Sequence, residues 1–217
     1  MAVKPTAPAS STWMAKPVDA IPNGALSRLR AEAAQCRACP LWRPATQTVF
    51  GRGPVSARLV LVGEQPGDRE DLAGQPFVGP AGQLLREALA QAGIDVASVY
   101  LTNAVKHFKF VPRGKRRLHQ RANASEQAAC RPWLAGELAR IAPEVVVALG
   151  AMAAQTLFGN AFRVSTQRGA WQALPNGRAA LATWHPSALL RMRAPDRVQA
   201  ERQFAQDLAR VADHLTR

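Results

Sequence analysis

Three cysteines and a histidine have the spacing of a ligand set for a metal ion or a metal cluster. Cys36 and Cys39 are separated by two residues, and His107 and Cys130 supply two further donors. A Cys-x-x-Cys pair can also be a redox site, but the βαβ unit that usually carries that chemistry is missing around this pair. Three thiolates and an imidazole are a recognised zinc set, and histidine also replaces cysteine in some iron–sulfur centres. The spacing therefore predicts ligation and leaves the metal undecided.

A second group of polar residues follows apolar runs that are typical of buried strands. One run ends at the segment 63–68 (Gly-Glu-Gln-Pro-Gly-Asp), another contains Asn103, and a third leads directly to His185. In α/β proteins the ligand lies at the carboxyl ends of the parallel strands. We therefore expect these residues to meet at one site, although an ordinary strand-to-helix turn explains residues 63–68 equally well when they are taken alone.

Residues 106–124 form a strongly basic segment without apolar periodicity. Five Arg or Lys residues lie within residues 113–121, together with Gly114 and His119. We expect a long loop here, and such loops in compact domains are commonly functional. The chain has 28 Lys and Arg against 15 Asp and Glu, a net charge of +13. This charge favours a polyanionic partner such as nucleic acid, but biased codon usage explains it equally well.

The order of the elements predicts an α/β fold. We expect a three-layer α-β-α sandwich with a four-stranded, mostly parallel central sheet, because apolar strands alternate with helical patterns. The expected strands are residues 58–62, 99–105, 145–149 and 179–183, and the expected helices include residues 25–35, 79–92, 125–141 and 196–215.

The N-terminal residues differ in composition from the rest of the chain. Residues 1–22 are rich in Ala, Pro, Ser and Thr, and we expect a disordered tail there and one domain over residues 23–217. No apolar run has the length of a signal sequence or of a membrane helix. We therefore expect a cytoplasmic protein that does not bind membranes.

Six ordered motifs together resemble the family 4 uracil-DNA glycosylases. They are Cys-x-x-Cys, Gly-Glu-x-Pro-Gly, Gly-Gln-Pro-Phe-Val-Gly, Thr-Asn-x-Val-Lys, Cys-x-Pro-Trp-Leu and His-Pro-Ser. Within that superfamily, Gln65, residues 103–110 (Asn-Ala-Val-Lys-His-Phe-Lys-Phe) and residues 114–119 (Gly-Lys-Arg-Arg-Leu-His) resemble the UdgX subgroup. The similarity extends from about Ala33 to the last helix.

The resemblance implies the uracil-DNA glycosylase fold, a cofactor and a uracil site. The cofactor would be a [4Fe-4S] cluster with three cysteine ligands and one histidine ligand, held by Cys36, Cys39, His107 and Cys130. Phe77 would stack on uracil, and the Asn103 carboxamide would pair with the O4 and N3–H groups of the base. The substrate-binding residues would be Gly63, Gln65, Gly67, Phe77 and Asn103.

The same resemblance implies a covalent reaction with DNA. His185 would stabilise the departing uracil, and His119 would attack C1′ of the sugar and stay attached to it, with Glu64 and then Asp68 as the supporting carboxylates. Arg113, Lys115, Arg116, Arg117 and Arg121 would contact DNA phosphates.

The expected partner is uracil-containing DNA, with single strands preferred because their bases are already accessible. A monomer without an obligate protein partner is expected. Two alternatives stay open: a conventional turnover glycosylase, and a non-catalytic nucleic-acid-binding protein with a cluster or zinc.

Overall fold

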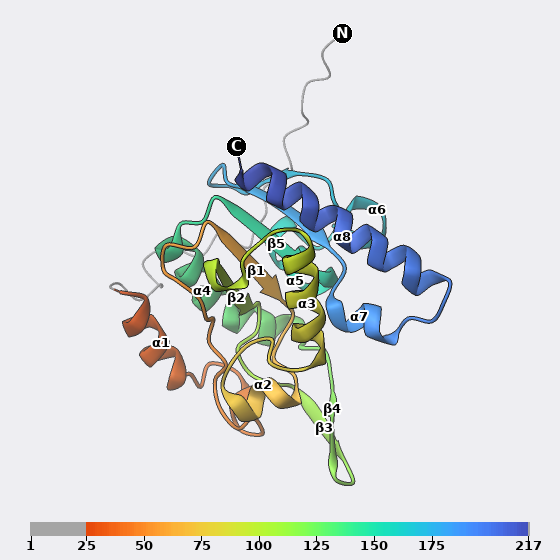
Figure 1. The fold of residues 1–217 in the computed structure, drawn as a ribbon. Helices are drawn as coiled ribbons and strands as arrows, with labels where there is room; N and C mark the ends of the chain where they lie inside the picture. Colours follow the sequence, from red (N-terminus) through yellow and green to blue (C-terminus); the bar gives the residue numbers. More distant parts are fainter. Residues whose placement is uncertain (1–24, 217) are drawn as a thin grey trace.

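The centre of the molecule is a mostly parallel β-sheet that the four apolar runs build. The computed structural model describes residues 25–216, so the expected tail lies outside the described residues. The strand order is β2-β1-β5-β7-β6, and Figure 1 labels β2, β1 and β5 of this sheet. The strands are β1 (Leu59–Gly63), β2 (Val99–Asn103), β5 (Val145–Leu149), β6 (Gln172–Ala173) and β7 (Ala179–Thr183). The four predicted strands are confirmed and run parallel, and the two-residue β6 adds an antiparallel edge.

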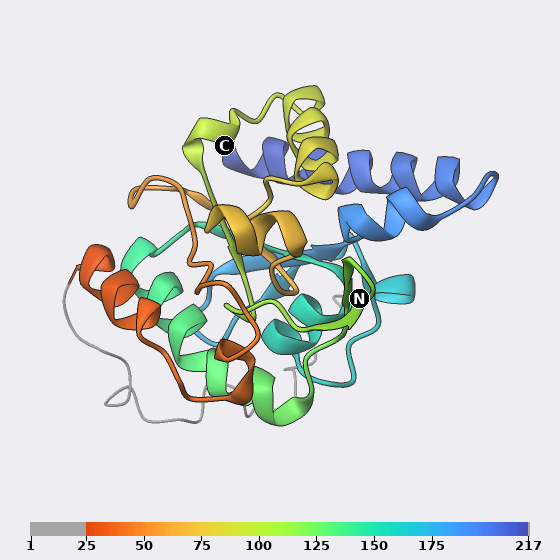
Figure 2. The same cartoon turned by 90° about the horizontal axis from the view of Figure 1, so that it is seen from below.

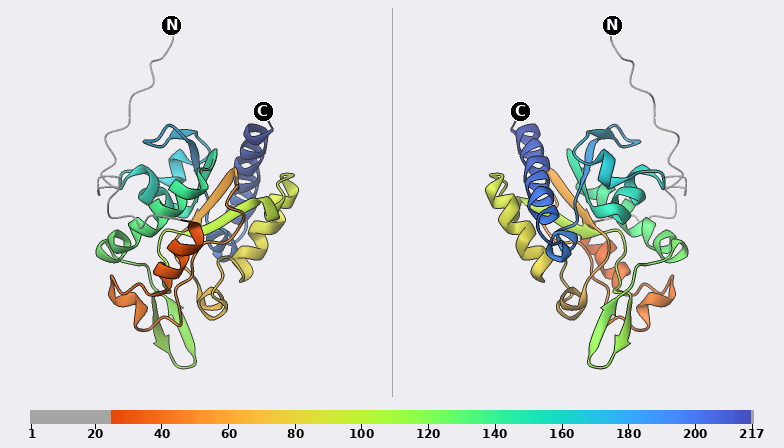
Figure 3. Two further views of the ribbon diagram at one scale, coloured as in Figure 1. Left: turned by 90° about the vertical axis from the view of Figure 1, so that its left-hand side faces the viewer. Right: turned by 90° about the vertical axis from the view of Figure 1, so that its right-hand side faces the viewer.

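Helices cover both faces of this sheet and complete the predicted three-layer sandwich (Figures 2 and 3). One apolar core joins the sheet to α1 (Leu26–Ala34), α4 (Ala124–Ile141), α5 (Gly150–Phe158) and α6 (Val164–Gln167). The opposite core joins it to α3 (Pro80–Gln91), α7 (Pro186–Arg191) and α8 (Asp196–Leu215). The short α2 (Asp68–Ala73) follows β1. The 3-10 turns are η3 (Pro40–Trp42) and η4 (Val96–Ser98). Within residues 25–216, every helix is too short or too polar to cross a bilayer.

The basic segment is a β-hairpin, so the prediction of an irregular loop was wrong. Strands β3 (Phe110–Arg113) and β4 (Arg116–His119) pair antiparallel, with Phe110 opposite His119. Gly114 has a φ of 57° in the two-residue turn, a conformation that glycine adopts easily. The hairpin extends away from the central sheet (Figures 1 and 3). Its side chains are mostly exposed, so the sequence shows no alternation of apolar and polar residues that would reveal a strand.

A fully buried ion pair lies behind the end of β2. The side chains of Lys106 and Glu137 have 0% exposure. Glu137 also accepts hydrogen bonds from the hydroxyls of Tyr100 and Thr102, at 2.9 and 3.0 Å. Lys106 Nζ donates to Thr102 Oγ1 and to the carbonyl oxygen of Asn103, both at 2.7 Å. Strand β2 therefore ends at Asn103, two residues before the predicted end. The chain bends after this residue, and the Lys106 side chain binds the Asn103 carbonyl oxygen.

Removing one member of this pair should destabilise the fold strongly. Glu137→Leu leaves the Lys106 ammonium group buried without its counter-ion, and we expect a loss of about 3–5 kcal/mol in the free energy of unfolding. Glu144→Leu is the control, because the Glu144–Arg58 pair is exposed, and it should cost at most about 1 kcal/mol. Urea unfolding followed by circular dichroism measures both variants, and equal losses would contradict the prediction.

Candidate active site

The carboxyl ends of β1, β2 and β7 border a cavity of about 570 Å³, which is a typical size for a small-molecule site. The end of β4 in the hairpin lies beside the same cavity. The lining residues are Glu64, Gln65, Gly67, Glu70, Phe77, Ala81, Asn103, Leu118, His119, His185, Ser187 and Arg191. The segments that the sequence analysis singled out therefore meet at one place.

Phe77 and Asn103 form a closely packed part of the cavity wall next to β1. A Cβ atom at Gly63 would lie 2.3 Å from Asn103 Oδ1 and 2.7 Å from Phe77 Cζ, so no larger residue fits there without a shift. Phe77 has a φ of 57°, which is uncommon for a residue other than glycine, and Arg86 Nη1 donates to its carbonyl oxygen at 2.8 Å. This arrangement fixes the ring at the cavity.

The Asn103 carboxamide is free to bind a ligand. The residue is 3% exposed, and its side chain makes no hydrogen bond within residues 25–216. Its amide atoms are not among the fully buried atoms without a partner, because they face the cavity. A carboxamide has one acceptor oxygen and two N–H donors. A ligand that offers a donor next to an acceptor would satisfy them.

His185 offers the cavity a neutral N–H donor. Its Nδ1 accepts from the backbone N–H of Ser187 at 3.1 Å, and the Ser187 hydroxyl lies 2.8 Å from the same nitrogen. A backbone N–H only donates, so Nδ1 carries no proton and Nε2 carries the proton of the neutral ring. Burial, followed by the charges of Arg191 and His119, lowers the His185 pKa to about 4. The ring is therefore neutral at pH 7.

His119 approaches the cavity from the hairpin. Its Nε2 lies 3.8 Å from Glu64 Oε1, too far for a hydrogen bond but close enough for a charge interaction. Partial burial lowers the His119 pKa; Glu64 acts in the opposite direction, and Arg191 adds to the lowering. The imidazole therefore has a free lone pair at neutral pH, which makes it a candidate nucleophile.

Gln65 fastens the base of the hairpin to the end of β1. Its Nε2 donates to the carbonyl oxygens of Gln120, at 2.9 Å, and Lys109, at 3.3 Å, which flank the two hairpin strands. Lys109 in turn pairs with Glu126 at the start of α4, at 2.8 Å. Gln65 was predicted to bind substrate; it lines the cavity, but its amide nitrogen is used to hold the hairpin.

Asp68 and Arg117 form an ion pair at α2 that the sequence analysis did not predict. Arg117 was expected to contact DNA, but its guanidinium group pairs with Asp68 and, at 2.6 Å, with the buried Asp71. It also lies over the rings of Phe108 and Phe110, 5.4 and 5.1 Å from their centroids. Asp68, expected to be catalytic, is outside the cavity lining. Both residues attach the hairpin to α2, and the roles predicted for them stay predictions.

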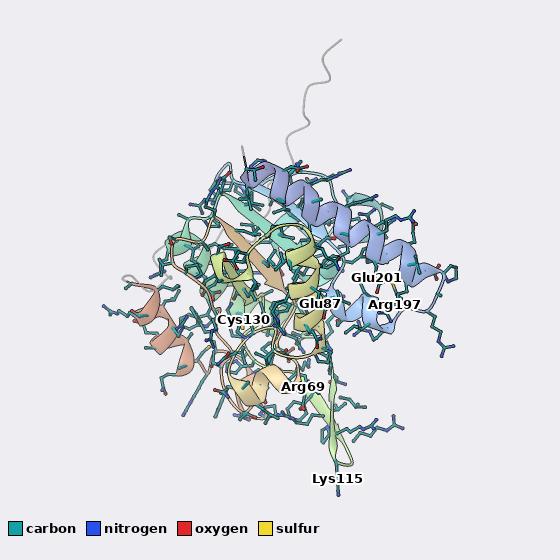
Figure 4. All side chains as sticks on the ribbon, viewed as in Figure 1. Arg69, Glu87, Lys115, Cys130, Arg197 and Glu201 are labelled. Atoms are coloured by element: carbon teal, nitrogen blue, oxygen red, sulfur yellow. The ribbon has the colours of Figure 1, made fainter. Side chains whose placement is uncertain are left out.

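The other predicted phosphate contacts lie on the outer part of the hairpin. Arg113, Lys115 and Arg116 are exposed, and none of the three takes part in an ion pair within residues 25–216. Figure 4 shows Lys115 at the end of the hairpin, far from Cys130 in the body of the protein.

Cys39 contacts Cys130 of α4, and each of the four predicted ligands has a polar neighbour. Trp133 Nε1 lies 3.2 Å from Cys36 Sγ, and a hydrogen bond from Cys130 lowers the Cys39 pKa to about 6. The backbone N–H of Lys106 contacts the Cys130 sulfur. His107 Nε2 lies 2.9 Å from Thr48 Oγ1. Among residues 25–216, no three His, Cys, Asp or Glu side chains are arranged to hold a single metal ion.

His107 has one ring nitrogen without a partner. Its Nδ1 is buried and accepts or donates no hydrogen bond in the described part of the chain. Burial lowers the pKa of the ring, so the neutral form with a free lone pair is favoured. Three sulfurs and this nitrogen are the soft and borderline donors that an iron–sulfur cluster or zinc requires.

Three residues of the site were missed by the sequence analysis. Glu70 accepts from the backbone N–H groups of Gly67, at 3.2 Å, and Gly79, at 2.7 Å, and so joins the starts of α2 and α3. A Glu three residues into a helix is a known capping signal, so it was detectable. Ser187 belongs to the His-Pro-Ser motif, whereas Arg191 carries no local signal.

The chain resembles one family of known proteins over most of its length. Residues 50–209 match the family model described as the uracil DNA glycosylase superfamily. A Type-4 uracil-DNA glycosylase of Thermotoga maritima is 40% identical over 161 residues, which cover 74% of this chain and 80% of the relative. Type-4 uracil-DNA glycosylases of Pyrobaculum aerophilum (85% of this chain, 91% of the relative) and Archaeoglobus fulgidus (84% and 89%) are each 35% identical to it.

The His185 ring should remain neutral well below pH 7. We expect an NMR titration to show a proton on Nε2 and a change of protonation near pH 4, because burial disfavours the charged ring. The unfolded chain takes up this proton near the ordinary value of 6.5, so the stability contributed by the neutral ring is present above that pH and lost as the pH falls towards 4.

A Ser187→Ala variant is the control for the tautomer. It removes the hydroxyl but keeps the backbone donor, so the proton should stay on Nε2. A signal from a proton on Nδ1, or a titration near 6.5, would show that the donor described above is wrong.

Proposed function

Because the chain belongs to the uracil DNA glycosylase superfamily, we propose that it excises uracil from DNA at this cavity and then stays attached to the sugar through His119. The observation that carries the proposal is the position of His119. A partly buried imidazole that favours its neutral form lies beside a carboxylate and next to the same cavity as Asn103 and His185.

Uracil recognition is proposed to use Asn103 and Phe77. The base must leave the stack and enter the cavity. There the Asn103 N–H donates to O4 and its Oδ1 accepts from N3–H, which satisfies the two free ends of the carboxamide. Cytosine has an amino donor in place of O4 and no N3–H, so it leaves both ends unmatched. The Phe77 ring stacks on the face of the base.

His185 is proposed to stabilise the leaving group. When the C1′–N1 bond breaks, its electron pair goes to uracil, and negative charge develops on O2. The neutral His185 Nε2–H is a donor that Ser187 holds in one tautomer. Because it needs no reorientation during the reaction, its contribution is of the order of a few kcal/mol.

Capture of the sugar is proposed to follow at His119. Cleavage leaves a cation-like C1′, and a lone pair of the imidazole forms the new C–N bond. The alkylated ring then loses its N–H proton, and the departed uracil anion takes up one proton, so charge and atoms balance. Glu64 lies close enough to His119 to stabilise the positive charge on the sugar and on the ring.

A [4Fe-4S] cluster is proposed at Cys36, Cys39, His107 and Cys130. The donor set and the unpartnered Nδ1 of His107 fit such a group, and Trp133 and the backbone of Lys106 supply N–H groups beside two of the sulfurs. Bound there, the cluster would act structurally, joining the Cys36 segment and the residues before the hairpin to α4.

The substrate is proposed to be single-stranded DNA in preference to duplex, because extrusion of an unpaired base costs little. The exposed Arg113, Lys115 and Arg116 would hold its phosphates. Action as a monomer in the cytoplasm, without an obligate protein partner, completes the proposal.

Covalent attachment can be tested with a labelled single-stranded oligonucleotide that contains one uracil. We expect wild-type protein to give a shifted band on a denaturing gel that survives heat and detergent, and His119→Ala to give none. His214→Ala is the matched control, because this histidine lies on α8 away from the cavity, and it should form the band like the wild type.

The other outcomes separate the alternatives. Free uracil and free abasic DNA without a shifted band would indicate a conventional turnover glycosylase and end the covalent proposal. Absence of uracil release from every oligonucleotide would indicate a non-catalytic binding protein and end the proposal of excision.

The cluster predicts a brown protein with a broad visible absorption band. Cys130→Ala should lose the band, and the folded cluster-free protein should bind DNA more weakly before the excision step is altered, because residue 107 lies just before the hairpin. A colourless wild-type protein that contains zinc would overturn the cluster assignment, and unchanged DNA affinity in the folded Cys130→Ala protein would overturn its proposed role.

A further inference from the structure

Asn103 ends β2 and His185 lies two residues after β7, and near the end of each strand a threonine binds a carboxylate. Thr102 is the second-to-last residue of β2, Thr183 is the last residue of β7, and both are fully buried. Thr102 Oγ1 donates to both carboxylate oxygens of Glu137, at 3.0 Å, and Thr183 Oγ1 donates to Asp207 Oδ2 at 2.7 Å.

These carboxylates reach the sheet from opposite sides. Glu137 belongs to α4 and Asp207 to α8, and the two helices cover opposite faces of the sheet (Figure 3). Each buried threonine is therefore bound by an acid from the helix layer on its own side.

Each carboxylate forms an ion pair, and the cation of that pair makes further hydrogen bonds. Lys106 pairs with Glu137 and also donates to the carbonyl oxygen of Asn103 at 2.7 Å. Arg168 donates to both oxygens of Asp207 at 2.8 Å, and the exposed fractions of the two side chains are 19% and 2%.

The second chain of contacts ends beside His185. Arg168 Nε donates to Gln203 Oε1 at 3.0 Å, and the same oxygen accepts from Trp184 Nε1 at 2.9 Å. Trp184 directly precedes His185. The first pair thus contacts the backbone of Asn103 directly, whereas the second contacts the side chain of the residue before His185 through Gln203.

Stability alone gives no reason for two such pairs. Replacing a buried ion pair by apolar residues of similar size is often neutral or stabilising, because the charges lose their hydration on burial. What a hydrogen-bonded pair adds is a defined direction for the groups around it. The Asn103 carboxamide, which no partner holds within residues 25–216, depends on that direction.

We propose that Lys106–Glu137 positions Asn103 and that Arg168–Asp207 positions His185 for the same uracil. The inference rests on the proposed function, since it assigns the two pairs to the recognition of the base and to the stabilisation of its leaving form. Neither pair touches the substrate. Each acts through one residue that does.

The test replaces each pair as a whole, so that no charge is left unpaired. Lys106→Met with Glu137→Gln removes the charges of the first pair, and Arg168→Met with Asp207→Asn removes those of the second. The amide oxygens still accept the hydrogen bonds of Tyr100 and Thr183, so no buried donor loses its acceptor. We expect both proteins to unfold at urea concentrations close to that of the wild type, with single-turnover uracil excision slower by about tenfold to a hundredfold, which is the effect of a misplacement of about 1 Å or less.

Combining the pair variants with Asn103→Ala or His185→Ala distinguishes a positioning role from a general disturbance of the fold. In an Asn103→Ala background, loss of the first pair should cost nothing further, whereas in a His185→Ala background it should cost its full factor. The second pair should show the reverse pattern, so each pair is the matched control for the other. The proposal would be overturned if each pair variant lowered the excision rate by the same factor in every background. Wild-type excision rates in both pair variants would also overturn it.

Two further measurements keep the test decisive. Thr102→Val and Thr183→Val remove only one hydroxyl each and should give the same crossed pattern with smaller factors if the pair variants fail to fold. NMR signals of the Asn103 amide should move only when the first pair is lost, and those of the His185 ring only when the second is lost. This readout needs no activity, so a wild type that releases no uracil would end the proposed function while the positioning is still tested.

Discussion

A buried ammonium group needs hydrogen-bond acceptors and a negative charge in place of the water that it loses. Lys106 has both, and it lies between the cavity and the cysteine site. Its side chain binds Glu137, Thr102 and the Asn103 carbonyl oxygen. Its backbone N–H contacts the Cys130 sulfur, and the next residue is His107. One buried residue therefore binds the strand end that borders the cavity with its side chain and Cys130 with its main chain, and so links the two sites.

The hairpin obeys a different constraint, because it shares no strand pairing with the central sheet. Side chains alone hold it: the Gln65 amide at its base, Arg117 against α2, and Lys109 against Glu126 of α4. Two of these contacts use charged groups whose partners are buried or nearly so, at 0% exposure for Asp71 and 8% for Glu126. Such contacts have a defined geometry, which suits an element whose last residue, His119, is proposed to attack the sugar.

The sequence predicted the parts of this structure that depend on local pattern. The four strands are continuous apolar runs, and the polar residues that follow them had to meet because parallel strands end at one edge. The hairpin was missed because its strands have no buried face. The ion pairs of Arg117 were not predicted for a related reason: nothing in the local sequence shows that Asp68 and Asp71 lie opposite it. Glu137 was invisible for the same reason, since its partner is 31 residues away along the chain.

The separation of the hairpin from the sheet divides the proposed chemistry between two structural units. The groups that read the base and release it end strands of the central sheet, whereas the group that captures the sugar ends a strand of an appended ribbon. Changes in the ribbon can therefore alter the fate of the sugar while the choice of base stays as it is. Evolution could convert a catalyst that is regenerated after each reaction into a protein that marks each lesion once and permanently, and could do so without rebuilding the pocket.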